Sequence, residues 1–290
     1  MDVPNDVQTD ASEDGLSRRD FAILSMAAAG VVANGGAAQA AAVTERALEI
    51  PTKDGTCDAV LVHAKGGGRK PGVLLYPDAF GLRPAMIDMG KRLAENGYST
   101  LIINQFYRVG KAPIFPADFS FANEAHRNRL MQMIADLDHE KVMRDAAAFV
   151  AFLDGQPEVD GKAKIGTVGF CMGGSMTIRA AAAAPERVGA VASFHGGRLV
   201  TADPTSPHKL IADTKAAYHI GIAVDDDEKE PQAKTALREA LDAAKRPYTL
   251  EVYPGTLHGW MVPDHPAMYN ATQAERGWTA MLALYKQALV

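Results

Sequence analysis

The 290-residue sequence contains only two cysteines, Cys57 and Cys171, which lie far apart in the chain. Neither belongs to a CxxC pair or a Cys/His cluster, so the sequence indicates neither a zinc site nor a scaffold held by several disulfides. A disulfide between the two is a minor alternative, because bridging requires Cα atoms within about 7 Å. We therefore expect a protein without a metal or other cofactor.

Positive charge is also scarce, since 35 acidic residues outnumber 30 lysines and arginines and the formal net charge is −5. Contact with a nucleic-acid backbone needs clustered basic residues, and no such cluster is present. Hydrophobic residues make up 47% of the chain and charged residues 22%, which is typical of a globular protein with a sizeable core. Because no internal repeat or low-complexity linker divides residues 41–290, we expect them to form one domain.

The sequence lacks a run of about 20 apolar residues, so no stable membrane span is expected. Residues 1–40 instead resemble a twin-arginine export signal, with Ser-Arg-Arg-Asp-Phe at 17–21, an apolar run at 22–32 and Ala-Gln-Ala at 38–40. Such a segment would be read by the export machinery and would deliver the mature protein to the periplasm or the exterior. The alternatives are an ordinary amphipathic helix or an uncleaved membrane anchor.

From Val43 onward, short apolar runs alternate with longer helical patterns, which favours an α/β fold with a mostly parallel sheet. The pattern predicts strands at residues 57–63, 72–76, 99–104, 164–170, 190–194, 218–224 and 248–253. It predicts helices at 84–96, 124–153 (one helix or two joined by a kink), 175–184, 231–244 and 271–289. The irregular stretch 108–123 either borders a binding site or is a surface loop.

Cys171 lies in the motif Gly-Phe-Cys-Met-Gly-Gly at 169–174, between a predicted strand and a predicted helix. A nucleophile on such a sharp turn takes a strained backbone conformation, and the residues two before and two after it must be small. Gly169 and Gly173 meet that demand. The amide of Met172 would face a tetrahedral oxyanion, and the helix N-terminus would favour the thiolate. We predict that Cys171 is a catalytic nucleophile.

Two alternatives to this interpretation concern the same turn. A dinucleotide-binding turn would belong to the first βα unit and would need an acidic residue about 20 positions later, whereas three predicted strands precede this motif. Cys171 could instead be an inert residue in a glycine-rich turn. The protein would then be a non-catalytic small-molecule-binding protein on the same fold.

A thiol with an ordinary pKa near 8.5 is mostly protonated at neutral pH, so a catalytic cysteine needs a base and the base needs an orienting acid. His258 follows the last predicted strand, and Asp225, Asp226 and Asp227 follow the strand before it. The order nucleophile, acid, histidine is that of α/β-hydrolases. We favour Asp226 as the acid, with Asp227 as the alternative and Asp225 third, because the acid lies a few residues beyond the strand.

The segment after the predicted strand 72–76 is expected to supply a second oxyanion donor, the amide of Ala79. Its neighbours Asp78 and Phe80 are candidates for contacting the thiol or the substrate, although Asp78 could equally be a turn residue. His195 also follows a strand and could line the pocket, but a hydrogen-bonded structural histidine is favoured. Trp260, close to the predicted catalytic histidine, is a further substrate-binding candidate.

These motifs resemble the dienelactone hydrolase family, whose members share a Gly-x-Cys-x-Gly-Gly elbow, an aspartate and a late His-Gly segment. The resemblance covers most of the mature chain. It implies an eight-stranded α/β-hydrolase core flanked by helices on both faces, and hydrolysis of a cyclic enol ester (carboxymethylenebutenolidase activity) through an acyl-thiol intermediate.

The resemblance also implies roles for two further residues. Asp78 stands where the best-known members carry a glutamate that modulates the cysteine. Arg108 can serve as the first of two arginines that bind the substrate carboxylate in some members. The second arginine is missing, because residues 260–263 contain no cation, so a substrate other than dienelactone is compatible with the sequence.

Overall fold

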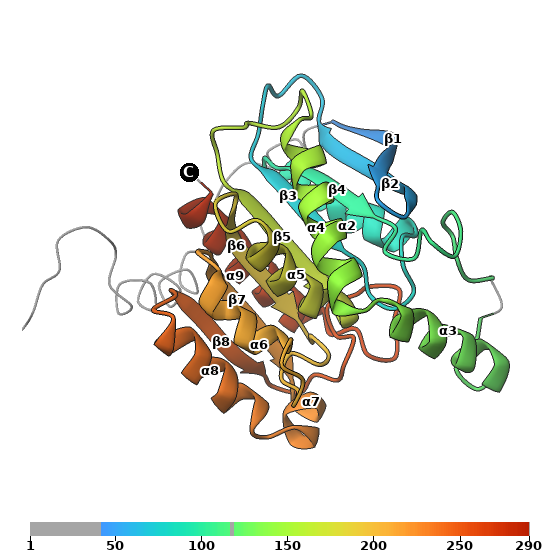
Figure 1. Ribbon diagram of the computed structural model, residues 1–290, viewed down its shortest axis with the longest axis vertical. Coiled ribbons are helices and arrows are strands. Elements are labelled where there is room, and N and C mark those ends of the chain that lie inside the picture. The colour runs from blue at the N-terminus through green and yellow to red at the C-terminus, as the bar shows by residue number, and fades with distance from the viewer. Residues whose placement is uncertain (1–41, 117–118, 290) are drawn as a thin grey trace, which may run out of the picture.

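The computed structural model describes residues 42–116 and 119–289 (Figure 1). The proposed export signal lies outside the described residues. The strands are β1 (Val43–Thr52), β2 (Gly55–Ala64), β3 (Gly72–Tyr76), β4 (Ser99–Ile103), β5 (Ile165–Phe170), β6 (Val188–Phe194), β7 (Ala217–Ala223) and β8 (Tyr248–Tyr253). The helices are α2 (Pro84–Glu95), α3 (Glu124–Asp136), α4 (His139–Asp154), α5 (Met172–Ala183), α6 (Pro207–Leu210), α7 (Val224–Lys229), α8 (Ala233–Ala243) and α9 (Ala271–Ala288), with a 3₁₀ turn at Ile211–Asp213.

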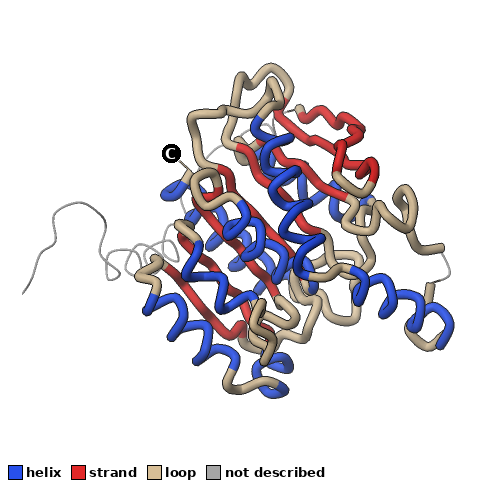
Figure 2. Tube along the Cα trace, viewed as in Figure 1, coloured by secondary structure: helices blue, strands red, loops and turns tan. Residues whose placement is uncertain are grey.

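The strands form one eight-stranded sheet in the order β1-β2-β4-β3-β5-β6-β7-β8. β2 pairs antiparallel with both β1 and β4, and every other pairing is parallel. Helices cover both faces of the sheet (Figure 2). The predicted fold class, an α/β-hydrolase fold with a mostly parallel central sheet, is confirmed.

Each face of the sheet carries its own hydrophobic core. On one face, α4, α5 and α8 bury residues against the strands, and on the other face α2 and α9 do so. The helical period explains the burial: in α4, for example, Val142, Ala146, Phe149 and Leu153 recur every three or four residues and all are buried. Since each such side chain contributes roughly 1.5–3 kcal/mol, the sheet is a stable platform for the loops at its carboxyl edge.

The sequence did not predict β1, α6 or α7. β1 was not predicted, because it is an edge strand whose half-exposed residues give a weak apolar pattern. Of the two alternatives for 124–153, the structure has two helices: α3 ends at Asp136, and the Asp138 side chain caps α4 by accepting a hydrogen bond from the amide of Lys141 at 2.8 Å. The three aspartates after β7 lie within the short helix α7.

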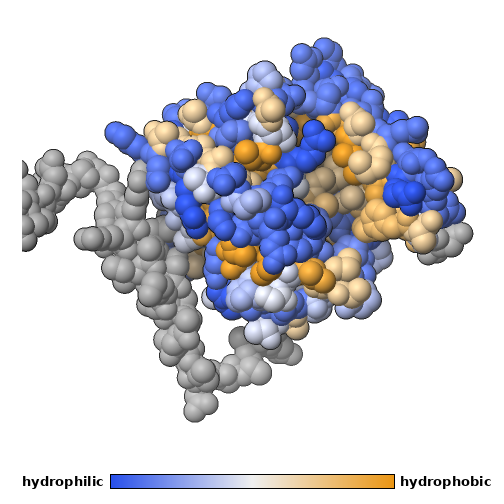
Figure 3. Space-filling model, turned by 90° about the horizontal axis from the view of Figure 1, so that it is seen from below, coloured by the Kyte–Doolittle hydropathy of each residue, from blue (hydrophilic) through white to orange (hydrophobic). Residues whose placement is uncertain are grey.

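None of the helices in the described parts of the chain has both the length and the apolar character that crossing a membrane requires. The carboxyl ends of β3, β5, β6, β7 and β8 meet at one edge, because these strands run parallel. Figure 3 views the molecule from below and shows hydrophobic surface around a hollow on that face.

Candidate active site

Cys171 occupies the turn between β5 and α5 with φ 53° and ψ −122°, a strained conformation for a residue with a side chain. Hydrogen bonds hold it there. Its amide donates to the Phe194 carbonyl (3.2 Å) and to His195 Nδ1 (3.1 Å). Its carbonyl accepts from the amides of Gly174 and Gly197, both at 3.0 Å. The surrounding structure therefore fixes the backbone from which the thiol projects.

The two glycines of the predicted elbow are required by close backbone approaches. A Cβ atom on Gly169 would lie 2.2 Å from the Gly173 carbonyl oxygen. A Cβ atom on Gly173 would lie 2.4 Å from the Tyr76 oxygen and 2.5 Å from the Pro77 oxygen. The absence of side chains here lets the start of α5 pack directly on the segment after β3, which carries the predicted oxyanion donor Ala79.

The structure gives each aspartate of α7 a different partner. Asp226 Oδ2 lies 2.8 Å from His258 Nδ1, which is the contact expected of an orienting acid. Asp225 Oδ1 accepts from the His258 backbone amide at 2.8 Å, so it holds the loop but not the ring. Asp227 pairs with Lys234. Of the three, Asp226 is the one placed against the imidazole.

The Cys171 side chain lies close enough to the His258 ring to act on its pKa. Partial burial disfavours the charged imidazolium, but the hydrogen bond to Asp226 and the interaction with Cys171 outweigh it and raise the pKa of His258 to about 10. The sulfur, the imidazole and the carboxylate thus form one chain of contacts. The arrangement can move a proton from the thiol to the imidazole while Asp226 stabilises the resulting positive charge.

The two predicted oxyanion donors lie in the same hydrophobic cluster. Met172 is the first residue of α5, so its amide is one of the donors that a helix leaves without an intrahelical acceptor. Ala79 is buried in the cluster, and Met172 packs against it. Both amides are thus candidates for stabilising an oxyanion formed next to Cys171.

The Asp78 carboxylate is buried and fully engaged. It accepts two hydrogen bonds from the Arg83 guanidinium (2.7 and 2.8 Å), one from the Phe80 amide (2.9 Å) and has His265 Nε2 at 3.0 Å. Burial would raise the pKa of Asp78, but the bonds from His265 and Arg83 lower it to about 2. Arg83 also forms two hydrogen bonds with Asp264. The described hydrogen bonds of Asp78 do not include Cys171. They hold the loop after β3 in place.

Sequence reasoning missed Arg83, Asp264 and His265. Asp78 and His265 are 187 residues apart in the sequence, so no local sequence pattern predicts their contact. A signal was nonetheless available, because a buried carboxylate next to an oxyanion donor requires a compensating cation.

The Arg108 side chain is engaged in ion pairs within the protein. Its guanidinium donates to Asp145 at 2.8 and 3.0 Å and to Asp54 at 2.7 and 3.0 Å, and it stacks on the Tyr107 ring. These contacts join three parts of the chain: the β1–β2 turn, which carries Asp54; the segment that follows β4; and helix α4, which carries Asp145. The structure therefore supports an ion-pairing role for Arg108 in holding these elements together, and does not support a role in substrate binding.

His195 and Trp260 lie behind the catalytic candidates. His195 is buried with φ 40°, and since its Nδ1 accepts from the Cys171 amide, its other ring nitrogen carries the proton. Burial lowers its pKa well below the ordinary value, and the nearby charge of His258 acts in the same direction. Trp260 is fully buried and stacks on Tyr253. Both residues therefore support the site from within.

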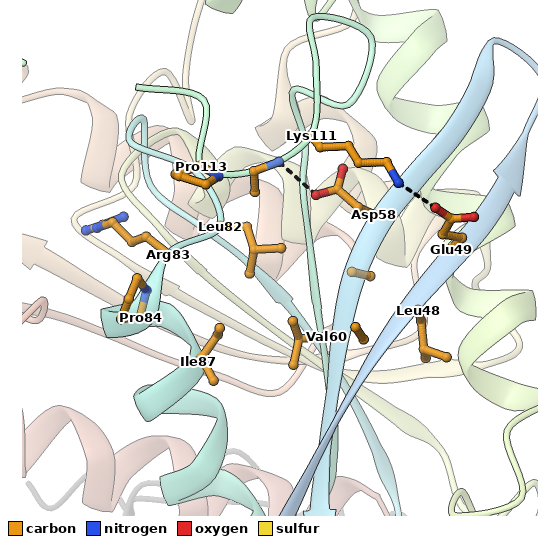
Figure 4. Close-up of a pocket in the computed structure, with 13 residues that line it drawn as sticks. Leu48, Glu49, Asp58, Val60, Leu82, Arg83, Pro84, Ile87, Lys111 and Pro113 are labelled. Atoms are coloured by element: carbon orange, nitrogen blue, oxygen red, sulfur yellow. Dashed lines mark hydrogen bonds and ion pairs between the residues drawn. The ribbon is translucent and has the colours of Figure 1, made fainter. Parts of the chain in front are cut away.

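A separate groove of about 560 Å³ lies between β1, β2 and α2. Figure 4 shows its apolar floor, with Leu48, Val60 and Ile87, and an ion pair between Lys111 and Glu49 at its rim. Neither Cys171 nor His258 lines this groove, so it is distinct from the candidate active site.

The mixed sheet, the strained cysteine after β5 and the histidine after β8 define the protein as an α/β-hydrolase. The sequence profile described as the dienelactone hydrolase family matches residues 57–289. The chain therefore belongs to the dienelactone hydrolase family, which supports a hydrolase acting on esters or lactones.

Known relatives agree with this assignment. A protein from Methylorubrum extorquens is 29% identical over 294 residues, covering 97% of each chain. A Rhodococcus opacus protein named carboxymethylenebutenolidase is 26% identical over 244 residues, covering 81% of this chain and 88% of its own. The crystal structure of a Klebsiella pneumoniae homologue superimposes with a TM-score of 0.73 at 22% identity, covering 85% of this chain and 99% of its own, which shows the shared fold.

The role of Arg108 can be tested by Arg108→Met. Because this change leaves the buried Asp145 carboxylate with the Tyr107 hydroxyl but without its charged partner, we expect a loss of about 3 kcal/mol in the free energy of unfolding, measured by urea denaturation. Arg144→Met is the matched control, since Arg144 pairs with Asp54 at the surface and its loss should cost about 1 kcal/mol or less. Unchanged stability with a raised KM would instead support a substrate-binding role.

The orienting role of Asp226 can be tested by NMR titration of His258. We expect Asp226→Asn to lower the pKa of His258 by about 1–3 pH units, whereas Asp227→Asn should leave it unchanged. The raised pKa means that the pairing of His258 stabilises the fold fully below about pH 6.5 and is lost as the pH rises through about 10. The opposite response of the two variants would assign the acid to Asp227.

Proposed function

We propose that the protein is a cysteine-dependent hydrolase of esters or lactones that works through an acyl-thiol intermediate. The observation that carries this proposal is the chain of contacts from Cys171 to His258 and on to Asp226 at 2.8 Å. The family membership and the carboxymethylenebutenolidase name of the Rhodococcus relative support the same reaction class.

In the first half of the reaction, the proton of the Cys171 thiol resides on His258, whose raised pKa favours the imidazolium, and the sulfur attacks the carbonyl carbon of the ester. Negative charge develops on the carbonyl oxygen, where the amides of Met172 and Ala79 stabilise it. The tetrahedral intermediate then expels the alcohol oxygen, which takes the proton from His258. The acyl group remains on the sulfur as a thioester.

In the second half, water replaces the alcohol. His258 removes a proton from the water as the oxygen attacks the thioester carbon, and the same two amides hold the oxyanion. Collapse of this intermediate releases the carboxylic acid and returns the proton to the sulfur. Asp226 keeps the ring in the orientation that both halves need.

The two cysteines differ sharply in environment, which gives the proposal a direct test. Burial raises the pKa of Cys57 to about 12, and its side chain is fully inaccessible, whereas Cys171 is partly accessible. We expect Cys171→Ala to lower kcat for phenyl acetate by at least about 10³-fold with an unchanged circular dichroism spectrum. Cys57→Ala is the matched control and should retain catalysis in the folded fraction.

Alkylation separates the enzyme from a binding protein on the same fold. Iodoacetamide should modify Cys171 in the native protein and abolish hydrolysis, while Cys57 reacts only after unfolding. Hydrolysis that persists in Cys171→Ala would refute the proposed nucleophile. Slow modification of both cysteines without any turnover would favour the binding protein.

We also propose that residues 1–40 direct export through the twin-arginine route and that the mature protein acts in the periplasm or outside the cell. The support for this proposal is the order of the paired arginines at 18 and 19, the apolar run and Ala-Gln-Ala at 38–40. The substrate would then be a small molecule present in that compartment.

A further inference from the structure

A third hydrophobic cluster lies apart from the two cores of the sheet, directly over the oxyanion donors. Its buried members include Ala79, Phe106 and Ile114, and Leu130 and Met133 of α3 complete it. The cluster connects Ala79, a proposed oxyanion donor, to the segment between β4 and α3 and to helix α3 itself. We call this cluster the apolar wall, because it adjoins Ala79 and Met172, the two proposed oxyanion donors beside Cys171.

Aromatic rings continue this wall toward solvent. The Phe80 ring, next to Ala79 in the chain, makes edge-to-face contacts with Phe115, Phe119 and Phe121 at centroid distances of 6.1, 5.3 and 5.4 Å. Phe119 and Phe121 also contact each other at 5.4 Å. These contacts hold the rings in fixed orientations, so the wall is organised before any ligand binds.

Part of this apolar surface is left exposed beside the catalytic candidates. Phe121 is 53% exposed, and Leu257, adjacent to His258, is 52% exposed. The two segments approach each other, because the His265 ring of the late loop lies 5.2 Å from Phe80. Leu257 thus belongs to the loop that carries His258 and Phe80 to the loop that carries Ala79, while Phe121 comes from the segment between β4 and α3. Exposed apolar groups at such a position are covered when a ligand supplies an apolar surface.

Resting on the proposed function, we infer that the preferred substrate is an ester that carries an aromatic or bulky apolar group, which packs on Phe80, Phe119 and Phe121. Offset and edge-to-face ring packing favours an aromatic group over a short alkyl group. Arg83 and His265, whose side chains lie 5.5 and 5.2 Å from the Phe80 ring, already pair with Asp78, so this wall recognises its ligand by apolar contact.

The test compares ethyl acetate, phenyl acetate and ethyl benzoate by proton release. We expect Phe121→Ala to lower the kcat/KM ratio of an aromatic ester over ethyl acetate by about tenfold. Comparing ratios between proteins removes the intrinsic reactivity of each ester. Met131→Ala is the matched control, because Met131 is 56% exposed on α3 and makes none of the ring contacts; it should leave the ratio unchanged.

A second measurement keeps this inference separate from the catalytic proposal. In a Cys171→Ala background, binding of ethyl benzoate by calorimetry should weaken when Phe121→Ala is added. Equal ratios and equal binding in both backgrounds would overturn the apolar wall while leaving a Cys171-dependent hydrolase intact. Turnover that survives Cys171→Ala would instead refute the catalytic proposal, whatever the ratios show.

Discussion

The strained backbone of Cys171 is the constraint on which the rest of the site depends. A residue with φ 53° keeps that conformation only when its surroundings impose it. Three sets of contacts constrain Cys171 in this way. The β6 end and His195 bind its amide, the amides of Gly174 and Gly197 bind its carbonyl, and Gly169 and Gly173 allow backbones to approach within distances that no side chain tolerates. Moving any of these elements would release the strain and turn the thiol away from the imidazole.

Electrostatic contacts bring the remaining loops to this fixed point. Arg83 joins the buried Asp78 to Asp264, and His265 adds a second link to the same carboxylate. The loop that carries Ala79 and the loop that follows His258 are thereby connected across a long stretch of chain. Because Asp78 stays ionised down to about pH 2, this connection is permanent at physiological pH. The contacts of Asp78 therefore anchor these loops, and none of its described hydrogen bonds reaches the thiol that the family resemblance implies it modulates.

The elements that the sequence could predict are those whose cause is local. The elbow, strands β2 to β8 and the position of His258 follow from apolar runs, small residues and chain order. β1 escaped prediction because only Ile50 of that strand is fully buried, and α7 because three consecutive aspartates resemble a solvated loop. The ion pairs of Arg108 were not predicted for a different reason: their acidic partners, Asp54 and Asp145, lie 54 and 37 residues away. Ion pairs between distant segments leave no periodic signal, so they require coordinates.

The buried rings behind the site link its electrostatics to its apolar front. His195 is held neutral by burial, and Trp260 closes the space beneath it, so the positive charge that His258 acquires has Asp226 as its main neutraliser on the protein side. A charge interaction strengthens as water leaves its surroundings. An aromatic group seated on Phe80 and Phe121 would displace water from the front of the same space, and would thereby strengthen both the contact between His258 and Asp226 and the hydrogen bonds to the oxyanion. On the proposed function, substrate recognition and proton transfer would be coupled through the loss of water, since the apolar wall adjoins Ala79 and Met172.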